Sequence, residues 1–411
     1  MQISSSVGCV AVLVAELLVS TALAQEILVI GREGNHCAED TTCFNRLHPE
    51  IPMAARAEPG QTIVFKTRNA GDLQLDPESS DKDSRGQGRL IGAVHPLTGP
   101  VHIAGAEAGD LLAVSVLDID PGEFGFTLIG GIGFVADRVP GPARALWRLN
   151  RREATTEHIP GVRIPNASFP GIVTVLPGPE QHREIMSREA ELAASGGAVA
   201  LPNPQWAVPA ALCGTEGSKP DECLRTSPPR EHGGNLDIRY LGVGVTIYLP
   251  CYVAGCGLAL GDVHYAQGDG EVSGTAIEMD ADVTVTTRVI KGAPPLTRGP
   301  HYEGPARLLD IPSRRFYATT GFPIKRKGDV PPDLAYLASE KVKNLENLSK
   351  DISLAARNAL LEMIDYMVMN YGLTHQQAYL VASVAVDLRI GQVVDAPNVG
   401  VTAILPLDIF E

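Results

Sequence analysis

The segment from residue 229 to residue 278 reads PREHGGNLDIRYLGVGVTIYLPCYVAGCGLALGDVHYAQGDGEVSGTAIE. A run of β-type residues lies at its centre, and glycine-rich polar segments lie on both sides. Glycine permits sharp backbone turns and the close approach of a ligand. The polar segments supply side chains that bind metal ions or transfer protons, namely Asp237, Asp262, His264, Gln267, Asp269, Glu271 and Glu278. This combination predicts β-strands that carry a site for a cation able to activate water.

Short runs of β-type residues recur before residue 326, separated by Gly- and Pro-rich turn signals. Such spacing is typical of mainly β proteins with a sandwich-like or barrel-like body. We therefore expect a β-rich catalytic body over residues 25–325. The runs are Glu26–Ile30, Thr62–Lys66, Asp110–Leu117, Gly171–Leu176, Val245–Leu249, Val283–Ile290 and Phe316–Thr319.

The sequence after residue 326 has a different pattern, with apolar residues at i, i+3, i+4 and i+7 that predict one buried helix face: Leu360, Met363, Ile364 and Met367. Gly372 suits the end of that helix, and Thr374 with Gln377 forms a capping box for a second helix. Val399–Leu405 returns to β-type residues. We expect a smaller C-terminal α-helical unit over residues 326–411, with a closing strand, packed on the body.

The first 24 residues resemble a secretory signal peptide. An apolar stretch from Val7 to Val19 precedes the small-residue site Ala22-Leu23-Ala24. The alternative is a buried N-terminal helix. We expect cleavage before Gln25 and a secreted or periplasmic protein.

Cysteine spacing agrees with export. Six cysteines follow the leader in three close pairs: Cys37 and Cys43, Cys213 and Cys223, Cys251 and Cys256. An even number of cysteines in an exported chain favours disulfides, and we expect the local pairings, although spacing alone leaves connectivity open. A cysteine metal site is the alternative, but none of the pairs is Cys-x-x-Cys.

Charge and hydropathy restrict the partners. The formal net charge is −14 at pH 7, and there is no basic run that would follow a phosphate backbone. Beyond the leader no apolar stretch is long enough to span a bilayer. We therefore expect no nucleic-acid or membrane partner, and a neutral or cationic small-molecule substrate.

Two glycine-flanked segments hold most of the candidate site residues. Gly233 and Gly234 allow the backbone to present N–H groups to a polarised oxygen. Asn235 is a candidate hydrogen-bond donor to a substrate carbonyl, and Asp237 is a candidate metal ligand or base. A Gly-rich turn capped by Asn and Asp is the alternative interpretation of this first segment.

In the second segment Asp262 and His264 are two residues apart, so an extended backbone directs both to one face, and Gln267 and Asp269 repeat the interval. Glu271 and Glu278 are candidate ligands or bases. An acidic hairpin loop is the alternative. His95 precedes Pro96 on a stiff turn and gains meaning only in combination with these groups.

The chain resembles the acetamidase/formamidase family. The similar motifs follow in order as HPLTGP from His95, GAEAGDLLAV from Gly105, PGI from Pro170, REHGGNLD from Arg230, GDVHYAQGDGE from Gly261 and SVAVDLRIGQVVD from Ser383 to Asp395. No Gly-x-Ser-x-Gly elbow, phosphate loop or His-Glu-x-x-His motif competes with this interpretation.

The resemblance implies a mainly β fold, a bound divalent metal ion, homo-oligomers and hydrolysis of short linear amides such as formamide and acetamide. By this resemblance, the site residues are expected to be His95, Asn235, Asp237, Asp262, His264, Gln267, Asp269 and Glu278. For the metal we expect zinc, with calcium as the alternative.

From these residues we predict specific roles. His264, Asp237 and Asp262 hold the metal, with Glu278 an alternative ligand to Asp262, and Glu278 or Asp269 acts as the general base. Asn235 and the backbone of Gly233–Gly234 stabilise the oxyanion, and His95 and Gln267 contact the substrate.

Two other functions remain open. One is an exported binding protein that holds a structural calcium ion and captures a small ligand without chemistry. The other is hydrolysis of a different carbon–nitrogen bond, in a larger or cyclic amide.

Overall fold

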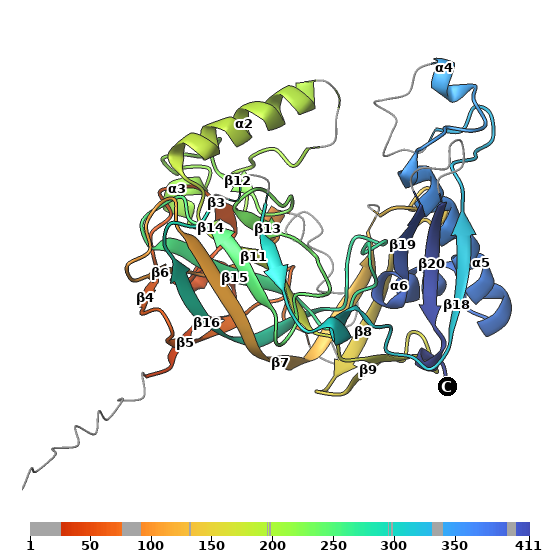
Figure 1. The fold of residues 1–411 in the computed structure, drawn as a ribbon, viewed down its shortest axis with the longest axis horizontal. Helices are drawn as coiled ribbons and strands as arrows, with labels where there is room; N and C mark the ends of the chain where they lie inside the picture. Colours follow the sequence, from red (N-terminus) through yellow and green to blue (C-terminus); the bar gives the residue numbers. More distant parts are fainter. Residues whose placement is uncertain are drawn as a thin grey trace, which may run out of the picture.

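A computed structural model describes residues 26–75, 92–130, 133–194, 196, 199–294, 296, 299–330, 340–392 and 400–411. The leader predicted over residues 1–24 lies outside the described residues. In the described part, β-strands dominate the body, and the helices of the C-terminal unit lie at one end of the molecule (Figure 1).

One large sheet forms the body. Its main path runs β10-β9-β8-β7-β16-β15-β11-β13 and has two ends, so the described sheet is not a closed barrel. The strands of this path are β7 (Leu111–Ile129), β8 (Ala143–Leu149), β9 (Glu153–Thr155), β10 (Arg163–Pro165), β11 (Phe169–Thr174), β13 (Gly233–Asn235), β15 (Cys256–His264) and β16 (Glu278–Ile290).

Shorter strands extend this sheet through pairs such as β1 with β5, β6 with β15, and β14 with β7. They are β1 (Leu28–Ile30), β2 (Cys43–Phe44), β4 (Ala55–Ala57), β5 (Thr62–Thr67), β6 (Leu97–Ile103), β14 (Thr246–Pro250) and β17 (His301–Glu303). A separate two-residue pair joins β3 (Arg46–Leu47) to β12 (Leu224–Arg225). The β-runs predicted from the sequence all coincide with observed strands.

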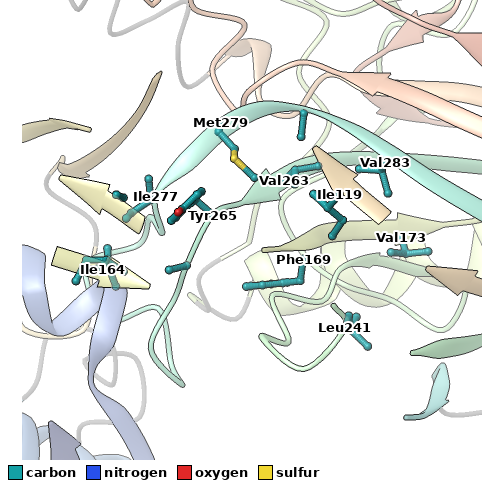
Figure 2. Close-up of a cluster of buried hydrophobic side chains, with 14 of the residues drawn as sticks. Ile119, Ile164, Phe169, Val173, Leu241, Val263, Tyr265, Ile277, Met279 and Val283 are labelled. Carbon is teal, nitrogen blue, oxygen red and sulfur yellow. The ribbon is translucent and has the colours of Figure 1, made fainter. Parts of the chain in front are cut away.

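The core of the body packs against the strands that carry the candidate site. Phe169, Val263, Tyr265, Ile277 and Met279 are buried and come from β11, β15, β16 and their connections (Figure 2). Because side chains alternate along a strand, burying Val263 and Tyr265 in this core leaves the residues between and before them on the other face of β15.

The C-terminal unit is a three-stranded sheet covered by two helices. Strand order is β18 (Phe316–Gly321), β20 (Gly400–Pro406) and β19 (Asp387–Gln392). Helix α5 (Ile352–Tyr371) packs on β18 and β20, and α6 (His375–Ala385) packs on β20, β7 and β8 (Figure 1). Strand β18 precedes residue 326 yet belongs to this sheet, and the predicted domain division after residue 325 stays a prediction.

Local signals placed the two long helices correctly. The Leu360, Met363, Ile364 and Met367 face of α5 is buried, and Gly372 ends the helix in the left-handed region at φ 67°. Thr374 and Gln377 form the capping box of α6 in both directions. Buried residues of both helices belong to the same core cluster as the body, so the unit and the body share one hydrophobic core.

The described residues also form three further α-helices, three short 3-10 helices and three disulfides. The α-helices are α2 (Pro179–Ala194), α3 (Ala210–Cys213) and α4 (Glu340–Lys343). The disulfides join Cys37 to Cys43, Cys213 to Cys223 and Cys251 to Cys256, which are the predicted local pairs. Among the described helices none has the length and hydropathy needed to cross a membrane.

Candidate active site

The register of β15 and β16 brings the central groups of the site together. His264 lies directly opposite Glu278 in the antiparallel pair. His264 Nε2 is 3.2 Å from Glu278 Oε2 and 3.6 Å from Asp262 Oδ2. All three side chains are buried, and their residues are at most 2% exposed. A histidine and two carboxylates therefore converge at the end of these two strands.

Asp237 completes this cluster from the segment that follows β13. Its backbone N–H donates to the carbonyl of Gly171 at 3.2 Å, and its Oδ1 lies 4.0 Å from His264 Nε2. A Cβ atom on residue 171 would lie 2.7 Å from Asp237 Oδ1 and 2.9 Å from His264 Cε1. Glycine at position 171 thus provides the room in which the two side chains meet.

Three carboxylate residues of the cluster have left-handed backbone conformations. The φ angles are 46° at Asp237, 53° at Asp262 and 43° at Glu271. Non-glycine residues rarely adopt such angles, and their concentration is typical of functional sites, where the surrounding structure imposes them. Asp262 and His264 share a face as expected, but Asp262 reaches it from this unusual conformation rather than from a regular extended strand.

Gln267 sets the orientation of the His264 ring. His264 Nδ1 lies 2.8 Å from Gln267 Oε1, and Gln267 Nε2 donates to the Asp237 carbonyl at 2.7 Å. Because the amide nitrogen of Gln267 donates to the Asp237 carbonyl, its oxygen accepts a hydrogen bond from the Nδ1–H of His264, which leaves Nε2 directed at the carboxylates. The ring of Phe169 contacts the imidazole edge-on, with centroids 5.1 Å apart.

Several buried polar atoms of the cluster have no hydrogen-bond partner: Asn235 Oδ1, Asp237 Oδ1, Asp262 Oδ1, His264 Nε2 and Glu278 Oε2. Buried polar atoms are rarely left unsatisfied, so a group of them close together is typical of a site that binds a cation or a polar ligand. Ligand atoms of Asp237, Asp262 and His264 lie within 4.8 Å of one another, as do those of His264, Glu271 and Glu278. The donor set fits a divalent metal ion held by one imidazole and several carboxylates.

Burial and mutual repulsion shift the carboxyl groups toward their neutral forms. Burial raises the pKa of Asp237 to about 7, with the negative charges of Asp262 and Glu278 adding to the rise and His264 opposing it. Burial also raises the pKa of Glu278, and it raises that of Glu271 well above its usual value. When all of these carboxyl groups are ionised, their negative charge exceeds the positive charge that the cluster itself supplies.

His264 and Asp262 shift in the opposite sense. Burial opposes protonation of His264, but the charges of Glu278 and Asp262 raise the pKa of its imidazole well above the ordinary value. Burial likewise opposes ionisation of Asp262, yet His95 and His264 hold the pKa of that carboxyl below its usual range. A bound divalent ion would replace the imidazolium proton as the positive charge among these carboxylates.

Two other predicted residues lie at the edge of the cluster. His95 Nε2 is 3.9 Å from Asp262 Oδ2, and burial lowers the pKa of His95, which keeps its ring neutral. Its backbone N–H donates to Thr226 Oγ1 at 2.6 Å. Asn235 Nδ2 donates one hydrogen bond to Asp237 Oδ2 at 2.7 Å, and Asn235 Oδ1 has no hydrogen-bond partner, so the amide can also accept; its role at the oxyanion stays a prediction.

The remaining predicted residues have other contacts. Gly233 donates its N–H to the Arg230 carbonyl at 3.0 Å, and Gly234 lies opposite Val173 in the pair of β13 with β11. Asp269 accepts a hydrogen bond from the Tyr240 hydroxyl at 2.5 Å and contacts a neighbouring network rather than His264. Their roles in substrate binding and proton transfer stay predictions.

Three residues that shape the site had no role assigned to them from the sequence. Glu271, which sequence analysis had named only as a candidate, lies with His264 and Glu278. Gly171 belongs to the Pro-Gly-Ile motif, which signalled its position but not its role. Phe169 carries no sequence signal that separates it from an ordinary core residue.

Comparison with known proteins identifies the family of the chain. The acetamidase/formamidase family matches residues 31–411. A formamidase from Methylophilus methylotrophus is 31% identical over 388 residues, covering 91% of this chain and 90% of that protein. An acetamidase from Mycolicibacterium smegmatis is 32% identical over 368 residues, covering 82% of this chain and 84% of that protein.

A solved structure extends the similarity to three dimensions. A gamma lactamase from Delftia acidovorans superposes with a TM-score of 0.82 at 30% identity, and the alignment covers 94% of both chains. The family match spans the body, the cluster around His264 and the C-terminal unit together. The chain is therefore a member of the acetamidase/formamidase family.

Proposed function

We propose that this protein is an exported, metal-dependent amidohydrolase that cleaves short linear amides of the formamide and acetamide type to a carboxylate and ammonia. Family membership makes the chain an amide-hydrolysing enzyme. The observation that carries metal dependence is the set of unsatisfied buried atoms around His264 Nε2.

His264, Asp237 and Asp262 would hold the ion, with Glu271 and Glu278 beside them. When bound, a divalent ion would lower the pKa of a water molecule, which provides a nucleophile at neutral pH. It would also polarise the substrate carbonyl, which makes the carbonyl carbon easier to attack. Imidazole and carboxylate donors suit zinc, and an additional carboxylate oxygen would suit calcium.

The chain's own residues supply the proton transfers. Glu278 Oε1 accepts the Ala276 N–H at 2.8 Å, which fixes the carboxylate and leaves Oε2 directed into the cluster. We assign Glu278 as the group that takes a proton from the attacking water and gives it to the leaving nitrogen as the carbon–nitrogen bond breaks. Burial raises the pKa of Glu278, which shifts it in the direction that general acid–base catalysis near neutral pH requires.

Asn235 and His95 suit the recognition of a primary amide. The free Oδ1 of Asn235 can accept an N–H of the substrate's NH₂ group, and the neutral ring of His95 lies beside Asp262. A site built from small, buried and mostly polar groups favours a small neutral substrate over an anionic one.

A cyclic amide is the second candidate substrate. The gamma lactamase from Delftia acidovorans shares the fold over nearly the whole chain at 30% identity. Ring opening of a γ-lactam breaks the same type of bond and needs the same proton transfers, but it releases an amino acid instead of ammonia.

Export and self-association complete the proposal. The apolar leader with its Ala22-Leu23-Ala24 site and the three disulfides support a secreted or periplasmic protein. Homo-oligomers are inferred from the family alone. Mass spectrometry of the mature N-terminus and light scattering of the purified protein test these two points.

The decisive experiment measures ammonia release from formamide, acetamide and larger amides, and ring opening of a γ-lactam, before and after removal of metal by a chelator. We expect turnover that the chelator abolishes and that added zinc restores. The Glu278→Gln variant should lose turnover at least 100-fold while retaining metal, since general acid–base catalysis contributes about 10²–10⁴.

Glu303→Gln, at an exposed glutamate of β17, is the matched control and should behave as wild type. Full turnover after metal removal would reject metal dependence. A folded, metal-loaded protein that hydrolyses none of these amides would favour the binding-protein alternative instead.

A further inference from the structure

The loop of residues 265–277, between β15 and β16, is held by the C-terminal unit rather than by the body alone. Gly268 donates its N–H to the Ser383 carbonyl at 2.9 Å, and Leu388 donates its N–H to the Asp269 carbonyl at 3.2 Å. A Cβ atom on residue 268 would lie 2.1 Å from the Val386 carbonyl oxygen, so the loop backbone lies directly against the end of α6.

Three buried side chains, four residues apart in sequence, make further contacts with this loop: Tyr379, Ser383 and Asp387. The Tyr379 hydroxyl donates to the Val272 carbonyl, next to Glu271. Ser383 Oγ accepts the Ser273 N–H at 3.1 Å and donates to the Thr275 carbonyl at 2.7 Å.

Asp387 contacts two of the chain segments that carry carboxylates of the cluster, the one with Asp237 and the one with Glu271. Its Oδ1 pairs with Arg239 Nη1, two residues after Asp237, and accepts the Asp269 N–H at 3.2 Å, two residues before Glu271. The side chains of Asp387 and Arg239 are 4% and 11% exposed, so this ion pair is shielded from solvent. Arg389 Nη2 lies 3.6 Å from the other carboxylate oxygen of Asp387, so loss of Asp387 removes a partner from two arginines, whereas loss of Arg239 leaves Asp387 paired with Arg389.

We propose that Asp387 is a positioning residue for the metal site, which fixes the Asp237 segment against the Glu271 loop. This inference rests on the proposed function for the identity of the site, but its geometry does not depend on it. Asp387 touches neither His264 nor the unsatisfied atoms in any contact described, so it acts through Arg239 and Asp269. Residues that orient metal ligands in this way change metal affinity or activity by about 10–100-fold when replaced.

The test compares the zinc affinity of the full-length wild-type protein with that of the Asp387→Asn variant, measured by competition with a chromogenic chelator. The measurement is made below the unfolding temperature of both proteins. We expect zinc to bind Asp387→Asn about 10–100-fold more weakly. Hydrogen exchange should accelerate at the amides of Gly268, Asp269 and Ser273, and kcat should fall more than KM rises.

Two variants separate positioning from simple loss of stability. Asp408→Asn makes the same chemical change in the same unit, at an exposed pair with Arg314, and should leave zinc affinity and exchange unchanged. Arg239→Gln removes the other partner of the ion pair and should reproduce Asp387→Asn. Because Asp387→Asn and Arg239→Gln each break the same Asp387–Arg239 ion pair, the double variant should lose little more zinc affinity than either single variant.

Equal zinc affinity and equal exchange in wild type and Asp387→Asn would overturn the proposal, whatever happens to the unfolding temperature. Arg239→Gln decides the same question if Asp387→Asn does not fold. A wild-type protein that binds no divalent ion would refute the proposed metal dependence, and the exchange of the Gly268 and Ser273 amides would then still decide whether Asp387 holds the loop.

Discussion

Gln267 joins His264 to the backbone of Asp237, through a 2.8 Å contact at the imidazole and a 2.7 Å hydrogen bond to the carbonyl. One amide therefore fixes both the tautomer of the histidine and the distance between two candidate metal ligands. Because Gln267 is only 3% exposed, water does not readily replace it.

Replacing Gln267 by leucine should release the His264 ring while keeping the volume of the side chain similar. We expect zinc affinity to fall about 10–100-fold, with a corresponding loss of turnover at limiting zinc. Titration against a chromogenic chelator measures the affinity. Gln376→Leu, at a half-buried position of α6 whose amide contacts the Pro140 carbonyl, is the control, and an unchanged affinity in Gln267→Leu would contradict the orientation described for His264.

Gly171→Ala should impair the site by steric means alone. The new methyl group would lie 2.7 Å from Asp237 Oδ1 and 2.7 Å from the Asp262 carbonyl, so the ligands must move apart. We expect at least about a tenfold loss of zinc affinity. Gly130→Ala, where the added Cβ meets no atom within 4 Å, should bind zinc as wild type does.

Stability should decrease in acid partly because of His232, which is buried and contacts Thr174. Burial lowers the pKa of His232 to about 3, below its ordinary 6.5. The unfolded chain therefore binds a proton first, and the stability contribution is lost as pH falls from about 6.5 toward 3. At pH 4.5 the loss should be roughly 2 to 3 kcal/mol.

Urea unfolding across this pH range measures the effect. The His232→Asn variant keeps a group that can face Thr174 Oγ1, the partner of His232 Nδ1 at 3.0 Å, but does not titrate. The difference in unfolding free energy between wild type and variant should therefore shrink as pH falls. A difference that stays constant from pH 7 to 4.5 would show that His232 is not the titrating group.

The Cys251–Cys256 disulfide should stabilise the fold without determining metal binding. It closes a short loop before β15, and cross-linking a loop of that size restricts the unfolded chain by about 2 kcal/mol. We expect the double alanine variant to lose at least that much stability and to keep its zinc affinity, since β11 and β16 hold His264 in register. A large loss of affinity in the folded variant would mean that the bridge also positions the site.

Much of the fold follows from local patterns in the sequence. The α5 stripe, the Thr374–Gln377 capping box and the short β-runs each depend on neighbouring residues, so periodicity and turn chemistry suffice to predict them. Most of the candidate site was also accessible, because Asp262, His264 and Glu278 lie in one short stretch of the chain.

The choice between the two loop carboxylates was not accessible from the sequence. Asp269 and Glu271 are both flanked by glycine, and only the path of the loop determines that Glu271 lies near His264 while Asp269 contacts Tyr240. The same holds for Gly171 and Asp387, whose contacts join segments far apart in the chain. No pattern within either segment specifies such a contact.

The contacts of Tyr379, Ser383 and Asp387 with the 265–277 loop have a consequence for biosynthesis under the proposed metal dependence. These residues leave the ribosome long after the ligands of the metal site, so the nascent chain carries the ligands before it has the parts that arrange them. High-affinity metal capture must then await release of the complete chain. If the chain is exported unfolded, as proposed, the metal supply of its destination rather than that of the cytosol would then select the ion.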